Sequence, residues 1–111
     1  MKIKTSEATP MQIDWLVAKC ECEPSGNYIF DGVLYPHLLT RYTIDWAQGG
    51  PIIEWEKIAL IPPNERIDEW EAVHPERMHD EQYGPTPLIA AMRCYVASKL
   101  GDEVAVPKEM I

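Results

Sequence analysis

The last third of the chain contains a helix whose two ends are specified by the residues around them. Thr86 is an N-cap residue, and Pro87 follows at the first helical position, where the N–H that proline lacks would have no intrahelical partner. Gly101 directly follows the last apolar residue and is expected to end the helix in a left-handed conformation. The spacing predicts one helix over 87–100, the best-defined element of this sequence.

This helix has two different apolar sides. Helical projection places bulky residues on one side: Leu88, Ile89, Met92, Tyr95, Val96 and Leu100. Small residues fall on the other side: Ala90, Ala91, Cys94, Ala97 and Ser98. We expect the bulky side to cover a sheet, where burial of each such side chain stabilises the fold by roughly 1.5–3 kcal/mol. The small side is suited to a close contact with another helix or with a second copy of the chain, although alanine is also the best helix former and tolerates water.

Further elements are predicted on both sides of the middle of the chain. Thr9-Pro10-Met11-Gln12 has the pattern of a capping box and begins a helix that buries Ile13, Leu16, Val17 and Cys20. Short strands are expected at 2–5, at 58–61, at 69–73, and in a hairpin around Asp31-Gly32. Residues 45–50 begin like a capped turn that breaks at the glycines, one or two helical turns follow over 51–57, and 74–83 reads as a polar loop. The fold class is therefore α+β: a single domain over 1–111 with an N-terminal helix, a small antiparallel sheet of three or four strands, and a C-terminal helix packed on one sheet face.

The negative charge is concentrated in one segment. The chain carries a formal charge of −8, and residues 65–81 hold seven carboxylates against two arginines. Proteins that bind nucleic acid neutralise phosphates with lysine and arginine, so direct binding of DNA or RNA is not expected. The acidic segment is suited to a basic protein partner, through Glu69, Glu71, Asp80 and Glu81. The alternative is that these carboxylates only keep the protein in solution.

The cysteines indicate a reducing compartment, and the apolar runs are too short to span a membrane. Three cysteines, Cys20, Cys22 and Cys94, do not form a disulfide framework, and no histidine is spaced to complete a zinc site with them. No apolar run approaches the roughly 20 residues that a bilayer span requires, and the N-terminus lacks a signal-peptide core. We expect a protein of the cytoplasm, without a metal or another cofactor and without a membrane partner.

Aromatic residues suggest two binding surfaces. Trp15 and Met11 lie opposite the buried stripe of the first helix, which is typical of an interaction surface unless the N-terminal strand or the loop after residue 23 covers Trp15. Trp46, Gln48, Gly49 and Gly50 form a candidate site for a planar ligand such as a nucleotide. Gly49-Gly50-Pro51 lacks the lysine and hydroxyl residue of a phosphate loop, so close packing is the stronger interpretation. We expect most of the four tryptophans to fill the core.

The sequence shows no motif of a known catalytic class. It contains no nucleophile elbow, phosphate-binding loop or paired zinc-ligand helix. His74 and His79 lie in the predicted loop over 74–83 and are the candidates for acid–base chemistry. Any loop of this composition would offer such candidates. An enzyme that acts through these histidines is the third functional hypothesis.

Three segments resemble a known family. They are Met1–Glu7 with Asp14-Trp15 and Val17–Cys20, then Asp45–Glu54, and then the run from Gly84 to Val104. Together they are similar to the NinX-like family of phage and prophage proteins. The resemblance implies a small accessory protein that a tailed bacteriophage makes in the cytoplasm of its bacterial host. It implies no assigned activity and no catalytic residue.

The leading hypothesis is therefore a protein that acts by binding a host or phage protein, in replication or host defence, and not by catalysis. Binding or sequestering a small nucleotide-like ligand is the alternative. The predicted protein-binding residues are Met11, Trp15, Glu69, Glu71, Asp80, Glu81, Ala90, Cys94 and Ala97. The small side of the C-terminal helix also offers a surface for a homodimer.

Overall fold

The computed structural model describes residues 1–22, 29–30, 33–34 and 41–110. Within these residues it has three α-helices: α1 (Pro10–Cys22), α2 (Trp46–Glu56) and α3 (Pro87–Leu100). Antiparallel strands accompany them, so the predicted α+β class and the packing of the C-terminal helix on strands are confirmed. None of the helices in this part of the chain has the length and hydropathy needed to cross a bilayer.

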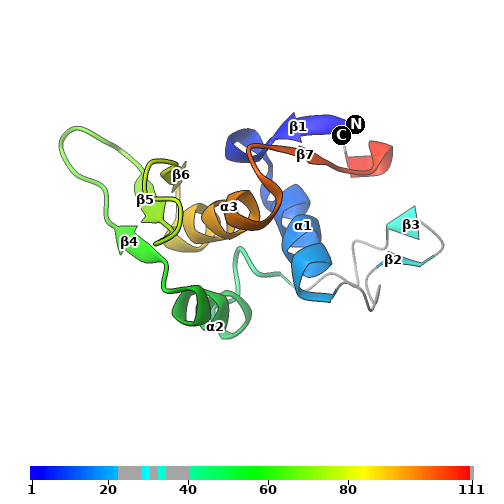
Figure 1. The fold of residues 1–111 in the computed structure, drawn as a ribbon, viewed down its shortest axis with the longest axis horizontal. Coiled ribbons are helices and arrows are strands. Elements are labelled where there is room, and N and C mark those ends of the chain that lie inside the picture. Colours follow the sequence, from blue (N-terminus) through cyan, green and yellow to red (C-terminus); the bar gives the residue numbers. More distant parts are fainter. Residues whose placement is uncertain (23–28, 31–32, 35–40, 111) are drawn as a thin grey trace.

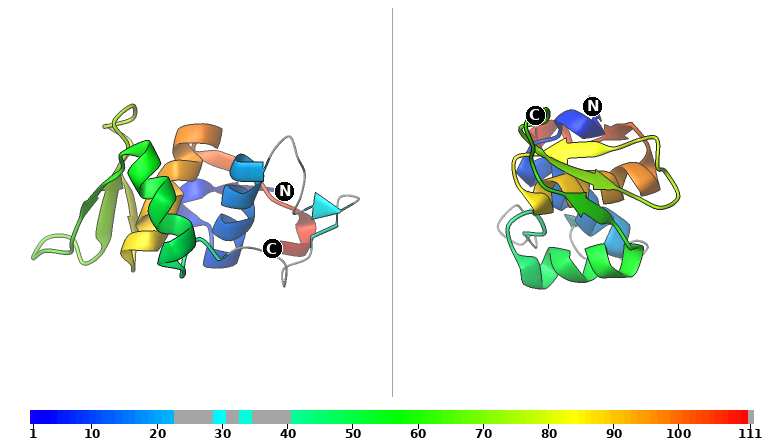
Figure 2. Two further views of the ribbon diagram at one scale, coloured as in Figure 1. Left: turned by 90° about the horizontal axis from the view of Figure 1, so that it is seen from below. Right: turned by 90° about the vertical axis from the view of Figure 1, so that its left-hand side faces the viewer.

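Helix α3 lies at the centre of the molecule, between a sheet on one side and α1 on the other (Figures 1 and 2). Its predicted ends are confirmed. The Oγ1 atom of Thr86 accepts a hydrogen bond of 3.1 Å from the backbone N–H of Ile89. Gly101 has a φ of +93°, and its N–H donates to the carbonyl of Ala97. Because both sides of α3 are covered, nine of the ten residues from Leu88 to Ala97 are buried, and Arg93 is the exception.

The sheet that α3 covers has three antiparallel strands, β4 (Ala59–Ile61), β5 (Trp70–Val73) and β6 (Gln82–Gly84), in that order. Ala72 and Gln82 pair in register and are buried, because they point toward the helix. A Cβ atom on Gly84 would lie 2.8 Å from the backbone nitrogen of Ala90, so glycine permits this close approach. Strand β6 corrects the prediction of a polar loop through 74–83, which missed it because the strand is short and contains a buried polar residue.

The two ends of the chain pair with each other. Strand β1 (Lys2–Lys4) runs antiparallel to β7 (Glu103–Ala105), with Ile3 opposite Val104. Short 3-10 turns, η1 (Thr5–Glu7) and η3 (Lys108–Met110), follow these strands. The Thr5 hydroxyl donates to the carbonyl of Gly101 over 2.7 Å, which ties the first turn to the end of α3. Strand β7 was not predicted from the sequence.

The predicted hairpin near residue 30 is present as β2 (Ile29–Phe30) paired with β3 (Val33–Leu34). Its Asp31-Gly32 turn lies outside the described residues. The hairpin forms a sheet of its own, and so do β1 and β7, beside the three-stranded antiparallel sheet of β4, β5 and β6.

Helix α1 begins with the predicted capping box. The Gln12 N–H donates to Thr9 Oγ1 over 3.3 Å, and the Thr9 N–H donates to Gln12 Oε1 over 2.9 Å. One turn later, Asp14 is fully buried and ion-paired with Arg41, and it also accepts a 2.9 Å hydrogen bond from the Thr43 N–H. Through these bonds α1 holds the segment that leads into α2.

Helix α2 does not break at its glycines, which corrects the prediction for 45–57. Asp45 caps its N-terminus by accepting from the Ala47 N–H over 3.0 Å, and Lys57 ends it in a left-handed conformation with a φ of 59°. A Cβ atom on Gly49 would lie 2.5 Å from the Tyr42 carbonyl oxygen and 2.7 Å from Leu88 Cδ2. Gly49 therefore has the close-packing role that the sequence favoured over phosphate binding.

Candidate functional site

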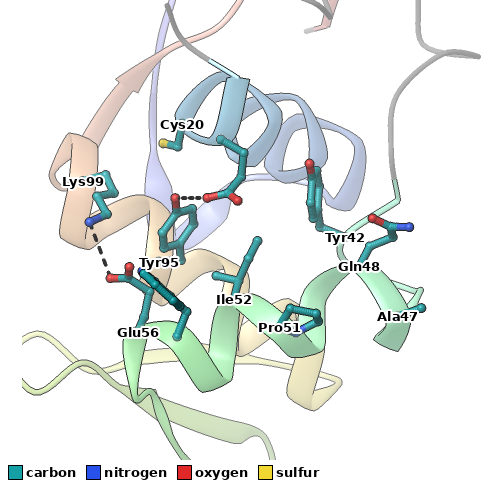
Figure 3. A pocket seen from close by; sticks show the side chains of 11 residues that line it. Cys20, Tyr42, Ala47, Gln48, Pro51, Ile52, Glu56, Tyr95 and Lys99 are labelled. Atoms are coloured by element: carbon teal, nitrogen blue, oxygen red, sulfur yellow. Dashed lines mark hydrogen bonds and ion pairs between the residues drawn. The ribbon is translucent and has the colours of Figure 1, made fainter.

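A groove lies where α2 crosses the ends of α1 and α3 (Figure 3). It has a volume of about 750 Å³. Its lining, which we call the α2 groove, consists of Cys20, Glu21, Tyr42, Ala47, Gln48, Pro51, Ile52, Trp55, Glu56, Tyr95 and Lys99. This volume lies within the range of roughly 300–1,000 Å³ that is typical of ligand pockets. Three helices and the segment before α2 thus converge on one concave surface.

One face of α2 forms a wall of this groove. Positions 47 and 48, 51 and 52, and 55 and 56 are separated by four residues, which places them on the same side of a helix. Ile52 is 6% exposed and packs into the core, whereas Trp55 is 82% exposed. A tryptophan with so much surface in water is unusual in a small protein, because the side chain gains from burial and is enriched at interaction hot spots.

Glu56 connects α2 to two other elements at one end of the groove. Its Oε1 atom lies 2.9 Å from His74 Nε2, just beyond β5, and 3.5 Å from Lys99 Nζ on α3. Burial by itself would raise the pKa of Glu56, but the His74 hydrogen bond and the Lys99 charge outweigh it, so the pKa is lowered. Glu56 is therefore a carboxylate at neutral pH.

Tyr95 and Glu21 form the second polar contact in the groove. The buried Tyr95 hydroxyl donates a hydrogen bond to Glu21 Oε2, and Glu21 itself is exposed at the end of α1 (Figure 3). Burial, followed by this bond to a carboxylate, raises the pKa of Tyr95, so the phenol keeps its proton. The Lys99 ammonium lies 5.8 Å from the centre of the Tyr95 ring. Two polar contacts, Glu56–Lys99 and Tyr95–Glu21, thus link the three helices at one end of the groove.

The structure brings few of the predicted ligand residues together. Gln48 lines the groove, but Gly49 is buried behind it against Tyr42. Trp46 is 54% exposed and does not belong to the lining. Gly50 has ordinary space around it, since an added Cβ would lie 3.8 Å from the Trp46 ring. The candidate site at 46–50 therefore divides between the groove, the core and the outer surface.

Two of the four tryptophans pack in the core and two are exposed. Trp15 is 6% exposed and Trp70 packs against the core, as expected. The core interpretation is wrong for Trp46 and Trp55, which both lie on α2 with more than half of their surface in water.

The predicted protein-binding residues fall into an inner and an outer set. Trp15 lies in the core beneath Lys19, whose ammonium is 5.6 Å from the ring centre, and Met11 is half-buried against that core. Ala90, Cys94 and Ala97 are buried inside the chain. The small side of α3 therefore contacts other elements of the same chain in this structure.

The outer set is acidic. Glu69 is exposed, and Glu71 and Glu81 lie near Tyr83 on the sheet face that points away from α3. Partial burial and these two carboxylates raise the pKa of Tyr83. Asp80 has a structural role, because it pairs with Arg77, which also donates to the Ala97 carbonyl over 2.6 Å.

The groups considered for catalysis have structural contacts. His74 is buried, and its Nδ1 atom accepts a 3.1 Å hydrogen bond from the Glu76 N–H while Nε2 faces Glu56. Burial raises the pKa of the Cys94 thiol to about 12, so it is not a thiolate at neutral pH. His79 is exposed. In the described part of the chain, no three histidine, cysteine or acidic side chains are grouped to hold a metal ion.

The site residues predicted from the sequence include Gln48 of the groove lining, but not Trp55, Tyr95, Glu21 or Glu56. The four-residue spacing along α2 is visible in the sequence, but it has meaning only when the helix runs through Gly49 and Gly50. Tyr95 and Glu21 come from helices far apart in the chain, and no local pattern predicts that they meet.

The comparisons with known proteins agree with the sequence resemblance. The family described as "Bacteriophage P22, NinX" matches residues 4–99, which include α1, α2, all of α3 except Leu100, and the whole lining of the α2 groove. A comparison with curated proteins gave no match. The chain therefore belongs to the NinX family of bacteriophage proteins.

Proposed function

We propose that this phage protein is a non-enzymatic accessory protein that binds a host or phage protein through the α2 groove. Trp55 carries the proposal, because it is 82% exposed at a concave surface whose other walls are fixed by polar contacts. Burying a tryptophan in a partner is a common source of binding energy, and its removal typically costs about 2 kcal/mol or more. The place of action would be the cytoplasm of the infected bacterium.

The burial of several residues that the sequence predicted to bind a protein supports the α2 groove as the binding surface. Trp15, Ala90, Cys94 and Ala97 have little surface to offer a partner. The structural contacts of His74 and the protonated thiol of Cys94 likewise support binding over catalysis.

The test is co-purification of a tagged chain from phage-infected cells. Trp55→Ala is expected to lower the recovery of the partner by about 30-fold, the equivalent of roughly 2 kcal/mol, at an unchanged melting temperature. Met78→Ala is the matched control, since Met78 is 64% exposed in the loop after β5 and does not line the groove. Equal recovery of the partner with Trp55→Ala and with the intact chain would show that the α2 groove is not the binding surface.

A small planar ligand is the second candidate, and the volume of the groove favours it. Tyr42, Trp55 and Tyr95 supply aromatic surfaces, but the carboxylates of Glu21 and Glu56 would repel a phosphate. A nucleotide that binds here should raise the melting temperature by mass action, and Trp55→Ala should abolish the rise. A nucleotide panel without any shift would leave only the protein-binding proposal.

A further inference from the structure

We infer that the α2 groove recognises a basic amphipathic segment of its partner, in which an arginine or lysine side chain extends from an apolar face. The inference rests on the proposed function, because it names the chemistry of the partner at the same groove. Three features carry it: a backbone carbonyl that lacks its usual helical donor, two carboxylates, and the aromatic side chains of the lining.

The backbone acceptor comes from a proline inside α2. Pro51 has no N–H, so it cannot donate to the carbonyl of Ala47 four residues earlier, which is the bond that the helix would otherwise make. Both residues line the groove, on the same side of the helix. The carbonyl of Ala47 therefore lacks its usual helical donor, on the wall that also carries the amide of Gln48, and a carbonyl accepts hydrogen bonds from N–H donors.

The carboxylates come from two different helices. Glu21 at the end of α1 is exposed and takes part in the Tyr95 hydrogen bond, and Glu56 at the end of α2 is partly buried. Among the residues that line the groove in the described structure, Lys99 is the one cation, and it lies against Glu56 and the Tyr95 ring. Because Lys99 is held by Glu56, the charge of Glu21 is the one more available to an incoming cation.

The aromatic residues suit the rest of such a side chain. Trp55 and Tyr42 lie on the lining with Ile52 and Pro51, so aromatic and aliphatic side chains are available beside the acceptors. A guanidinium stacks on aromatic faces and donates five N–H bonds, so one arginine can use both the rings and the oxygens. Apolar neighbours in the partner segment would cover Trp55.

The charge of the whole chain favours the same partner. A formal charge of −8 attracts basic segments over long distances and raises their association rate, while it repels acidic ones. A phosphate-bearing or acidic segment would face Glu21 and Glu56 without a free cation among the lining residues described here. A basic amphipathic segment is therefore complementary both to the α2 groove and to the overall charge of the chain.

The experiment is selection from a random peptide library displayed on the surface of cells, with the intact chain as bait and Trp55→Ala as the counter-selection. The inference predicts that peptides dependent on Trp55 combine apolar residues with arginine or lysine and carry a net positive charge. Enriched peptides that depend on Trp55 but are neutral or acidic would overturn the inference and leave the proposed function standing. If no enriched peptide depends on Trp55, the inference and the groove of the proposed function both fail.

One selected peptide then tests the role of Glu21. Glu21→Gln keeps an acceptor for the Tyr95 hydroxyl but removes the charge, and is expected to weaken peptide binding by about three- to tenfold. Glu54→Gln is the matched control, because Glu54 is exposed on α2 outside the groove lining and its replacement changes the net charge equally. Equal weakening by both variants would mean that only the overall charge matters, and would overturn recognition inside the groove.

Discussion

Two adjacent glycines in α2 have different surroundings. Gly49 lies against the Tyr42 carbonyl and Leu88, whereas Gly50 has open space toward Trp46. In the sequence the pair suggests a turn, since two glycines each cost about 1 kcal/mol in a helix relative to alanine. The close approach to Tyr42 explains the first glycine, and the contact with Leu88 also lets α2 lie close to the start of α3.

Gly49→Ala is expected to lower the free energy of unfolding by about 1–3 kcal/mol, because the new methyl group would overlap a backbone oxygen. Gly50→Ala is expected to raise it by about 0.5–1 kcal/mol, since that position is helical and has space. Urea unfolding of both variants measures the difference. Stabilisation by both substitutions would show that Gly49 has no packing role.

Individual caps were predictable, whereas the exposure of individual tryptophans was not. Thr86, Gly101 and the Thr9–Gln12 pair act through neighbours within a few residues, so the local sequence is enough to identify them. Whether Trp55 is buried depends on elements that are distant in the chain. The same residue type therefore fills the core at position 15 and lies in water at position 55.

At the scale of elements, α2 is joined to β5 and α3 through Glu56. His74 directly follows β5, and Lys99 lies on the last turn of α3. These contacts hold one end of the groove wall, in addition to the packing of Gly49 and Ile52 elsewhere on α2.

The Glu56 contacts predict a pH dependence. Because its folded-state pKa lies below the ordinary value of 4.5, Glu56 contributes its full stability above about pH 4.5 and loses it as the pH falls through the folded-state pKa. Glu56→Gln should therefore be less stable than the intact chain by about 1 kcal/mol at neutral pH, and the difference should shrink near pH 3. Melting curves across this range test the prediction, with Glu54→Gln as the exposed control. A deficit of the same size at both pH values would contradict it.

The long elements were predictable from periodicity, and the short strands were not. Helices α1 and α3 have caps and apolar stripes, whereas β6 and β7 have three residues each. A strand of three residues contains too little alternation of polar and apolar residues to be identified from the sequence. In β6 the inward-facing residue, Gln82, is polar although it is buried, which is the opposite of the expected pattern. Pairing with β5 and β1 determines these strands, and the local sequence does not show that pairing.

At the scale of the whole molecule, the ends of the chain close the fold. Val104 and Val106 are buried, and the Val106 N–H donates to the Met1 carbonyl over 2.9 Å. Strand β7 lies beyond the residues that match the family, and it pairs with β1, of which only Lys4 falls within the match. We infer that the region after residue 99 contributes to stability and not to the groove.

Val104→Ala should lower the free energy of unfolding by about 2 kcal/mol, since two buried methyl groups are lost. Ala105→Ser, at the next and exposed position, should change it by less than about 0.5 kcal/mol. Urea unfolding of the two variants provides the comparison. Peptide or partner binding should be unchanged in both, because neither residue lines the groove. Weakened binding in Val104→Ala at a temperature where it is folded would show that the ends of the chain contribute to the site.

The central claim is that the α2 groove is the surface that meets a protein partner. Its most direct test is a photo-crosslinking residue at position 48, which lines the groove and is exposed, compared with the same residue at position 78. During phage infection, the account predicts a discrete protein adduct from position 48 and none from position 78. An adduct from position 78 with none from position 48, in folded protein, would contradict it.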